Sequence, residues 1–154
     1  EARERAFQLI YEMSVQTDKS TEAVIADTAL EQDFIPDGYI RGAVTGVREK
    51  TQEIDALISG CAVGWKLSRM SAVSLAILRL AVYEMLYVDD VPFSVAINEA
   101  VENAKKYDHS SAPKFINGIL NAVAVKTGLK AEKPAAPDSR KIRSACRGRF
   151  LTDG

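Results

Sequence analysis

The apolar positions in the second half of the chain recur at the spacing of three amphipathic helices. Between residues 77 and 88 they repeat every three or four positions, and only Glu84 interrupts the apolar stripe. Pro92 ends this helix, and Ser94 is expected to cap the next one. The third helix has Pro113 in its first turn, where a missing N–H is harmless. These segments predict a helical hairpin followed by one more helix.

The first half of the chain predicts further helices. Their expected ranges are residues 3–17, 21–31 and a long segment from 39 to 60. Gly42 and Gly46 lie inside the long segment, where each costs about 1 kcal/mol relative to alanine, so another backbone is expected to pack closely there. No segment alternates apolar and polar residues as a strand does. The predicted fold is therefore all-α, a compact bundle of about six to seven helices.

The composition predicts one folded domain at residues 1–127 and a flexible basic tail at residues 128–154. The chain has 154 residues, of which 47% are hydrophobic, and this is enough for one sizeable core. The tail places two prolines in an alanine-rich stretch before a basic run with little periodicity. A solvated extension and an auxiliary RNA-binding arm both remain open for it. No apolar stretch approaches the roughly 20 residues of a membrane span, so no membrane insertion is expected.

The residues with the most reactive side chains do not form a catalytic or metal-binding pattern. Cys61 and Cys146 lie far apart without a CxxC spacing, which predicts reduced thiols and a cytoplasmic location. His109 is the only histidine and has no second histidine or cysteine beside it, so no metal or cofactor is expected. Asn98 and Glu99 are adjacent and point about 100° apart on a helix, with no nucleophile nearby in the sequence. The chain is not expected to be an enzyme.

Charge is distributed unevenly along the chain. Residues 126–154 hold eight Lys or Arg against three acids, whereas residues 1–125 hold twelve against eighteen. The body of the protein is therefore about six charges negative and repels phosphate at long range. Contact with RNA would need a local basic patch, the tail, or a basic partner protein that supplies the missing charge.

Several blocks of the sequence match the pattern of one known family. The blocks are ILRLAVYE at 77–84, VPFSVAINEAVENAK at 91–105, KFINGIL at 114–120, AFQLIY at 6–11, and Trp65, Leu67 and Arg69 in a WxLxR pattern. In these blocks the chain resembles the NusB family of transcription antitermination factors. The resemblance covers roughly residues 3–125. It implies a compact helical fold that binds RNA.

The resemblance also implies a function in transcription. Together with the ribosomal protein NusE, a protein of this kind is expected to bind a single-stranded boxA element in nascent leader RNA. It would hold this RNA near RNA polymerase in an antitermination complex and support processive transcription of rRNA operons. Two alternatives remain open: an RNA-binding domain of an rRNA-modifying protein, and a structural helical module that forms a homodimer.

Two groups of residues are candidates for RNA contact. Arg3 and Arg5 lie on the first helix, where the resemblance implies an arginine-rich RNA-contacting segment; by themselves they would be an ordinary solvated face. Lys114, Phe115 and Asn117 open the last helix. At such a helix start, N–H groups and a lysine can meet phosphate while an aromatic ring stacks on a base. Phe115 also has the spacing of a core residue, so both roles remain open for it.

The candidates for contact with NusE are Tyr11 on the first helix and Glu84 on the helix that precedes Pro92. The resemblance supplies this partner, and an acidic body suits a basic protein because complementary potentials speed association. A structural role for Glu84 is equally open. Asp108, which lies just before the last helix, is expected to repel phosphate locally.

Overall fold

The chain folds into α-helices throughout the part that the computed structural model describes, residues 2–62 and 70–129. In chain order the helices are α1 (Ala2–Val15), α2 (Thr21–Glu31), α3 (Gly38–Glu49), α4 (Thr51–Cys61), α5 (Ala72–Tyr87), α6 (Phe93–Tyr107) and α7 (Ala112–Lys126). No strand occurs in these two ranges, so the predicted all-α fold is confirmed. Residues 130–154 of the predicted tail, and the block from Trp65 to Arg69, lie outside the described residues.

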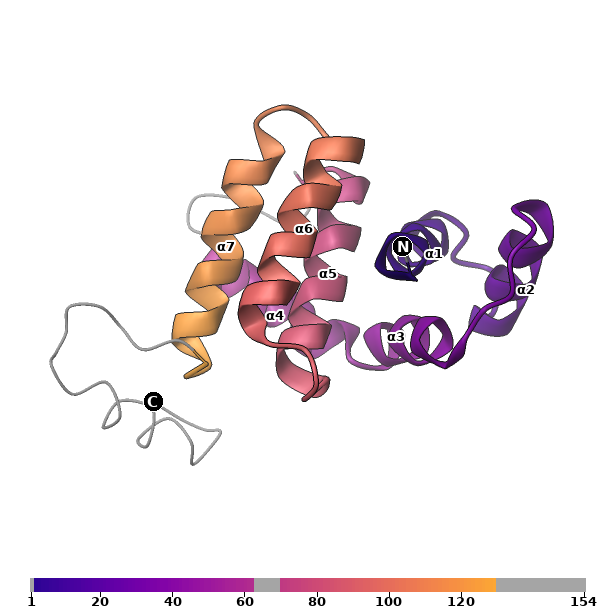
Figure 1. Ribbon diagram of the computed structural model, residues 1–154, viewed down its shortest axis with the longest axis horizontal. Coiled ribbons are helices and arrows are strands. Elements are labelled where there is room, and N and C mark those ends of the chain that lie inside the picture. The colour runs from indigo at the N-terminus through magenta and orange to yellow at the C-terminus, as the bar shows by residue number, and fades with distance from the viewer. Residues whose placement is uncertain (1, 63–69, 130–154) are drawn as a thin grey trace, which may run out of the picture.

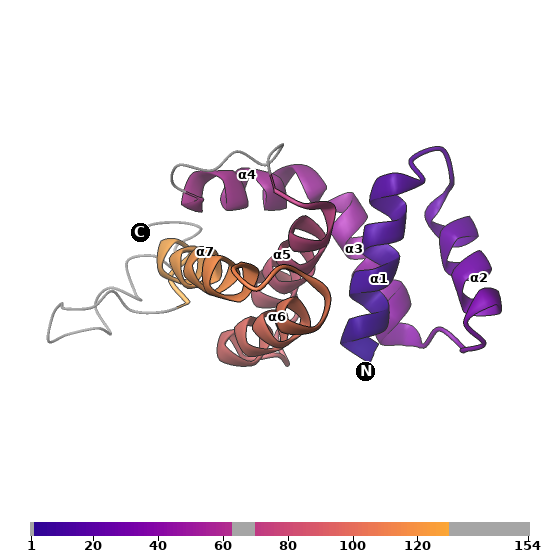
Figure 2. The same ribbon diagram turned by 90° about the horizontal axis from the view of Figure 1, so that it is seen from above.

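Helix α5 runs through the centre of the molecule and organises the packing of the other helices. It packs against α1 and α3 on one side and against α4, α6 and α7 on the other (Figures 1 and 2). Its buried residues lie all around the helix and include Ile77, Leu78 and Val82, as expected for a helix that other helices surround. Helix α2 packs against α1 and α3, and Figure 1 shows it at the edge of the molecule opposite α7.

Short polar side chains determine where several of the helices begin. Ser20, Asp37 and Ser71 occupy the N-caps of α2, α3 and α5, and each side-chain oxygen accepts a hydrogen bond from the backbone N–H three residues later. The predicted cap at Ser94 is wrong. Pro92 is the N-cap of α6 and holds extended backbone angles, so Ser94 already lies in the first turn. The cap at Ser20 explains why the predicted and observed starts of α2 coincide.

The long helix predicted for residues 39–60 is wrong, because the chain turns at Lys50. Lys50 ends α3 and precedes the first residue of α4, with φ −104° and ψ 14°. The hydroxyl of Thr51 donates to the carbonyl of Val47 at 2.7 Å and supports this turn. The turn sends the two helices to different neighbours, since α3 packs against α1 while α4 packs against α7. Both helices thereby bury apolar residues in one core.

The two glycines inside α3 have different surroundings. The ring of Tyr83 lies where a Cβ of Gly46 would be, so close packing is present at this position, although a side chain and not a backbone makes the contact. Nothing lies within 4 Å of the corresponding point at Gly42, so the expected close packing is absent there. Of the two glycines in α3, Gly46 alone has a packing reason to be a glycine.

The described residues contain none of the features expected for a membrane span or a metal centre. None of their helices is long and apolar enough to cross a membrane. No three His, Cys, Asp or Glu side chains within the described ranges gather in a way that could hold a metal ion.

Candidate nucleic-acid interface

The N-terminal turn of α1 is tied to a buried carboxylate. The Nε of Arg3 lies 3.1 and 3.0 Å from the two carboxylate oxygens of Glu84 on α5, and the hydroxyl of Tyr39 on α3 donates to the same group. Glu84 is only 1% exposed, whereas the side chain of Arg3 is 27% exposed. A carboxylate removed from water is tolerated when a cation and further donors compensate for its lost hydration. Glu84 therefore joins α1, α3 and α5.

This burial decides between the two roles that the sequence left open for Glu84. A partner protein cannot touch a side chain that is 1% exposed, so the structure favours the structural role. Burial and the hydrogen bond to Glu84 raise the pKa of Tyr39, which keeps its hydroxyl a proton donor. Tyr11, the other candidate for partner contact, is half-buried against the core, and its contact with a partner stays a prediction.

Arg5 points to a different side of α1 because residues two positions apart differ by about 200° around a helix. Its NH1 donates to the side-chain oxygen of Gln32 at 2.8 Å, and its Cζ lies 4.3 Å from the ring centre of Phe34. The two arginines therefore do not form one basic patch. Arg3 faces α5, whereas Arg5 faces the segment that follows α2.

The end of α6 packs onto α1 through an aromatic and ionic contact. The ring of Tyr107 lies 5.2 Å from that of Phe7, and its hydroxyl donates to Glu4 at 3.1 Å. The ammonium of Lys106 donates to the same carboxylate. The hydrogen bond from Lys106 is the main reason that the pKa of Glu4 is lowered, followed by that from Tyr107, while partial burial opposes the shift. Tyr107 remains 42% exposed.

Sequence reasoning missed this contact. The structure pairs Glu102 with Lys105 at 3.2 Å and brings Lys106 to Glu4, which lies 102 positions earlier in the chain. A local signal was nevertheless present: two lysines and a tyrosine follow one another at the end of a helix, shortly before the predicted RNA-binding helix. The pattern of aromatic and basic residues is typical of surfaces that bind single-stranded nucleic acid.

The start of α7 presents Lys114 and Asn117 to solvent. Phe115 is half-buried and packs against the core. Its contact with the core fits the predicted core role, and its exposed part leaves base stacking possible. Together with Lys114 and Gly118 it borders a hollow of about 390 Å³. The side-chain oxygen of Asn117 accepts a hydrogen bond from Asn121 one turn later at 3.2 Å.

Asp108, in the turn between α6 and α7, faces the protein more than the solvent side that RNA would approach. Its carboxylate accepts hydrogen bonds from the hydroxyls of Ser71 and Ser74 and from the N–H of His109. Ser71 is the N-cap of α5, and a helix start carries partial positive charge. The negative charge of Asp108 is therefore partly compensated, and the local repulsion of phosphate is weaker than the sequence predicts.

The end of α6 links the two groups of predicted RNA residues. Tyr107 contacts α1, and α7 begins five residues after it. The residues that Tyr107 and Lys106 contact, Phe7 and Glu4, lie in the N-terminal half of α1. We define the α1–α6–α7 surface as the residues Arg3, Lys105, Lys106, Tyr107, Lys114, Phe115 and Asn117. Arg5 lies outside it, since its side chain faces Gln32 and Phe34.

A small all-α protein with this packing around a central helix matches one family. Residues 1–125 match the NusB family, and the chain belongs to it. The transcription antitermination protein NusB of Ruminiclostridium cellulolyticum is 44% identical over 146 residues, which is 93% of this chain and 96% of the relative. The corresponding protein of Acetivibrio thermocellus is 49% identical over 125 residues, covering 79% of this chain and 85% of the relative. The resemblance noted from the sequence is confirmed.

Solved structures agree with this assignment. NusB of T. maritima superposes with a TM-score of 0.70 at 33% identity, covering 80% of this chain and 87% of that one. A crystal structure of the antitermination factors NusB and NusE in complex with double-stranded RNA superposes with a TM-score of 0.71, covering 79% of this chain and 92% of that one. Its identity is 24%, so this second likeness supports the fold alone.

Proposed function

We propose that this chain is a transcription antitermination factor that binds a boxA-type element of nascent RNA jointly with the ribosomal protein NusE. The RNA would lie on the α1–α6–α7 surface, close to RNA polymerase, and the complex would support processive transcription of rRNA operons in the cytoplasm. The family membership supports the process. The partners are inferred from the resemblance to NusB, and a protein of the same fold has been crystallised with NusE and RNA. The observation that supports the location is the contact of Lys106 and Tyr107, at the end of α6, with Glu4 and Phe7 on α1. Lys114 is exposed in the first turn of α7, the next helix along the chain.

The distribution of charge supports both the location and the need for a partner. Residues 12–37 hold seven Asp or Glu and one Lys, which accounts for the whole negative excess of residues 1–125. This acidic stretch includes α2, at the edge of the molecule opposite α7 (Figure 1). The remaining surface is close to neutral, so it neither repels RNA strongly nor attracts it strongly. A basic partner protein would supply the missing attraction.

Each side chain of the surface has a definite proposed role. Lys106 and Lys114 contact phosphates, and the rings of Tyr107 and Phe115 are the candidates for stacking on bases, which is how proteins hold exposed single strands. Arg3 directs its Nε at Glu84, and since a guanidinium carries five N–H donors it can meet a phosphate with the others. Arg5 contributes first by holding α1 to Phe34, and its phosphate contact remains a prediction.

A titration of labelled boxA RNA at fixed salt tests the joint mechanism. We expect weak binding by the chain alone and a clear gain in affinity when NusE is added, with a scrambled RNA of the same length as the control. An unchanged dissociation constant across the NusE titration would contradict the proposal. If the chain sediments as a stable dimer that binds no RNA in either condition, the structural homodimer is the better account.

A further inference from the structure

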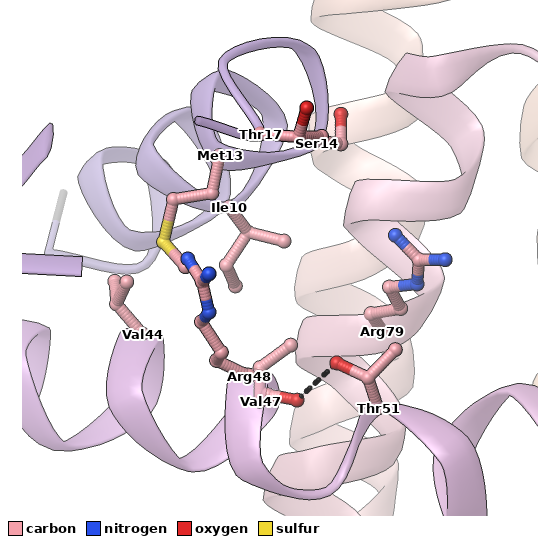
Figure 3. A pocket seen from close by; sticks show the side chains of 9 residues that line it. All are labelled: Ile10, Met13, Ser14, Thr17, Val44, Val47, Arg48, Thr51 and Arg79. Atoms are coloured by element: carbon pink, nitrogen blue, oxygen red, sulfur yellow. Dashed lines mark hydrogen bonds between the residues drawn. The ribbon is translucent and has the colours of Figure 1, made fainter. Parts of the chain in front are cut away.

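A second feature lies at the other end of α1, away from the α1–α6–α7 surface. Helices α1, α3 and α5 and the start of α4 enclose a pocket of about 200 Å³ (Figure 3). Its floor consists of Ile10, Met13, Val44 and Val47, most of which are buried in the core. Thr17 borders the pocket some fourteen residues along the chain from Arg3, which is roughly 20 Å along the helix direction.

Two hydroxyl groups beside the pocket form hydrogen bonds with the backbone, and the floor of the pocket is apolar. The hydroxyl of Ser14 donates to the carbonyl of Tyr11 at 2.7 Å, and that of Thr51 donates to the carbonyl of Val47 at 2.7 Å. Both hydroxyls therefore donate to backbone carbonyls: Ser14 to one in its own helix, and Thr51 to one in the preceding helix. An apolar pocket of this kind gains by taking up an apolar group, because water inside it finds few partners.

Two arginines border the pocket from opposite sides, and they differ in their partners. Arg79 forms a bidentate pair with Asp55, with both N–O distances at 2.8 Å. Figure 3 shows the side chain of Arg48 extending from the last turn of α3 toward Met13. Arg48 is exposed and takes part in none of the ion pairs formed within the described residues. The pocket therefore has an apolar floor beside a cation that is available to a carboxylate.

The volume of the pocket indicates what kind of group it can hold. A dry cavity of about 150 Å³ holds benzene, whereas sites for small organic ligands usually measure roughly 300 to 1,000 Å³. A pocket of about 200 Å³ thus fits one large apolar side chain, as the anchor pockets of protein interfaces do. RNA is a poor candidate because none of the lining side chains is an aromatic ring on which a base could stack.

We propose that this pocket takes a leucine- or phenylalanine-sized side chain from an acidic segment of a partner protein, with a flanking carboxylate on Arg48. This partner differs in charge from the basic protein proposed for joint RNA binding. Because the pocket and the α1–α6–α7 surface lie toward opposite ends of α1, both can be occupied together. The site would let an RNA-bound factor recruit a further acidic protein.

Peptide titrations monitored by chemical shifts of the full-length protein test this site. The probe is a capped tripeptide, acetyl-Glu-Phe-Glu-amide, and its two controls replace Phe by Ala or both Glu by Lys. We expect the probe to shift resonances of the second half of α1 and the end of α3. Each control should bind at least about tenfold more weakly, the factor that a charge-assisted hydrogen bond or a buried aromatic side chain supplies.

Two variants and one matched control separate the pocket from a general surface effect. Arg48→Gln should weaken the probe about tenfold, whereas Arg41→Gln, on the same helix but paired with Glu22 outside the pocket, should not. Ser14→Phe should fill the pocket and abolish binding while thermal unfolding stays close to that of the parent, since Ser14 is exposed. Equal binding of the probe by all variants, or no shifts at the pocket up to the solubility limit of the probe, overturns the proposal. It is also overturned if single-stranded oligouridine shifts the same resonances and Arg48→Gln weakens that binding instead.

Discussion

The Nε of Arg3 on α1 lies 3.0 Å from a carboxylate oxygen of Glu84 on α5, although the two residues are 81 positions apart in the chain. This ion pair connects the first helix to the central one at the edge of the proposed RNA surface. Arg3, which the sequence assigns to RNA contact, therefore also has a structural role.

Replacing Arg3 by alanine should therefore destabilise the fold. The substitution leaves the buried carboxylate of Glu84 with Tyr39 as its remaining side-chain donor, at an expected cost of about 1 to 3 kcal/mol. From helix propensity alone no loss is expected, because alanine is the better helix former. Arg5→Ala is the matched control, which removes exposed contacts to Gln32 and Phe34 and should cost less than about 1 kcal/mol. Urea unfolding of both variants measures the difference, and equal losses would show that Glu84 does not depend on Arg3.

The two glycines of α3 should respond oppositely to the same substitution. Gly42→Ala should stabilise the protein by about 0.5 to 1 kcal/mol, because the added methyl group meets nothing and alanine favours the helix. Gly46→Ala should destabilise it by about 1 to 3 kcal/mol, because the ring of Tyr83 must move. Thermal unfolding of the two variants checks this pair, and a gain in stability at both positions would mean that Tyr83 moves aside without cost.

Glu4 should limit the affinity of the surface for RNA, because its carboxylate binds Lys106. Glu4→Gln removes that charge and should strengthen RNA binding and steepen its salt dependence.

The pKa of Glu4 is lowered in the folded state, so its pair with Lys106 contributes stability above the ordinary carboxyl pKa and loses it as pH falls through the lowered value. The parent should therefore lose some stability relative to Glu4→Gln in acid. Anisotropy titrations at several salt concentrations and unfolding between pH 3 and pH 7 measure the two effects. Identical pH profiles would rule out the ionic part of the argument.

Lys106→Gln and Lys114→Gln should each weaken RNA binding without sequence preference and lower the salt slope by roughly 0.7 per lost phosphate contact on a single strand. Lys19→Gln is the matched control, since Lys19 pairs with Asp27 on the acidic helix α2, away from the proposed surface. The control should bind RNA with the affinity and salt slope of the parent. If all three variants lose affinity equally, the effect reflects net charge and not a defined surface.

The sequence predicts the parts of this structure that depend on local signals. The start of α2 follows from the cap at Ser20, and the end of α7 follows from Gly128, which has a positive φ of 82°. The turn at Lys50 could not be predicted, because the apolar spacing continues across it without a glycine or proline. It arises from the packing of α4 on α7, which no local signal records.

For the candidate site, too, the sequence does not show the contacts between distant segments. The basic and aromatic residue types are visible in the sequence, but their pairing depends on contacts between distant segments. Lys106 and Glu4 are 102 positions apart, and only the packing of α6 on α1 brings them together. Arg3 and Arg5 likewise face different sides of α1, and their partners, Glu84 and Gln32, lie far away in the sequence.

Photo-cross-linking tests the central claim most directly, namely that RNA lies on the α1–α6–α7 surface. BoxA RNA that carries 5-iodouridine is bound together with NusE, irradiated, and its attachment points are mapped by mass spectrometry. The account predicts adducts at Tyr107 or Phe115, which disappear when unlabelled boxA RNA competes. Adducts confined to residues 12–62, with none on α6 or α7, would contradict it.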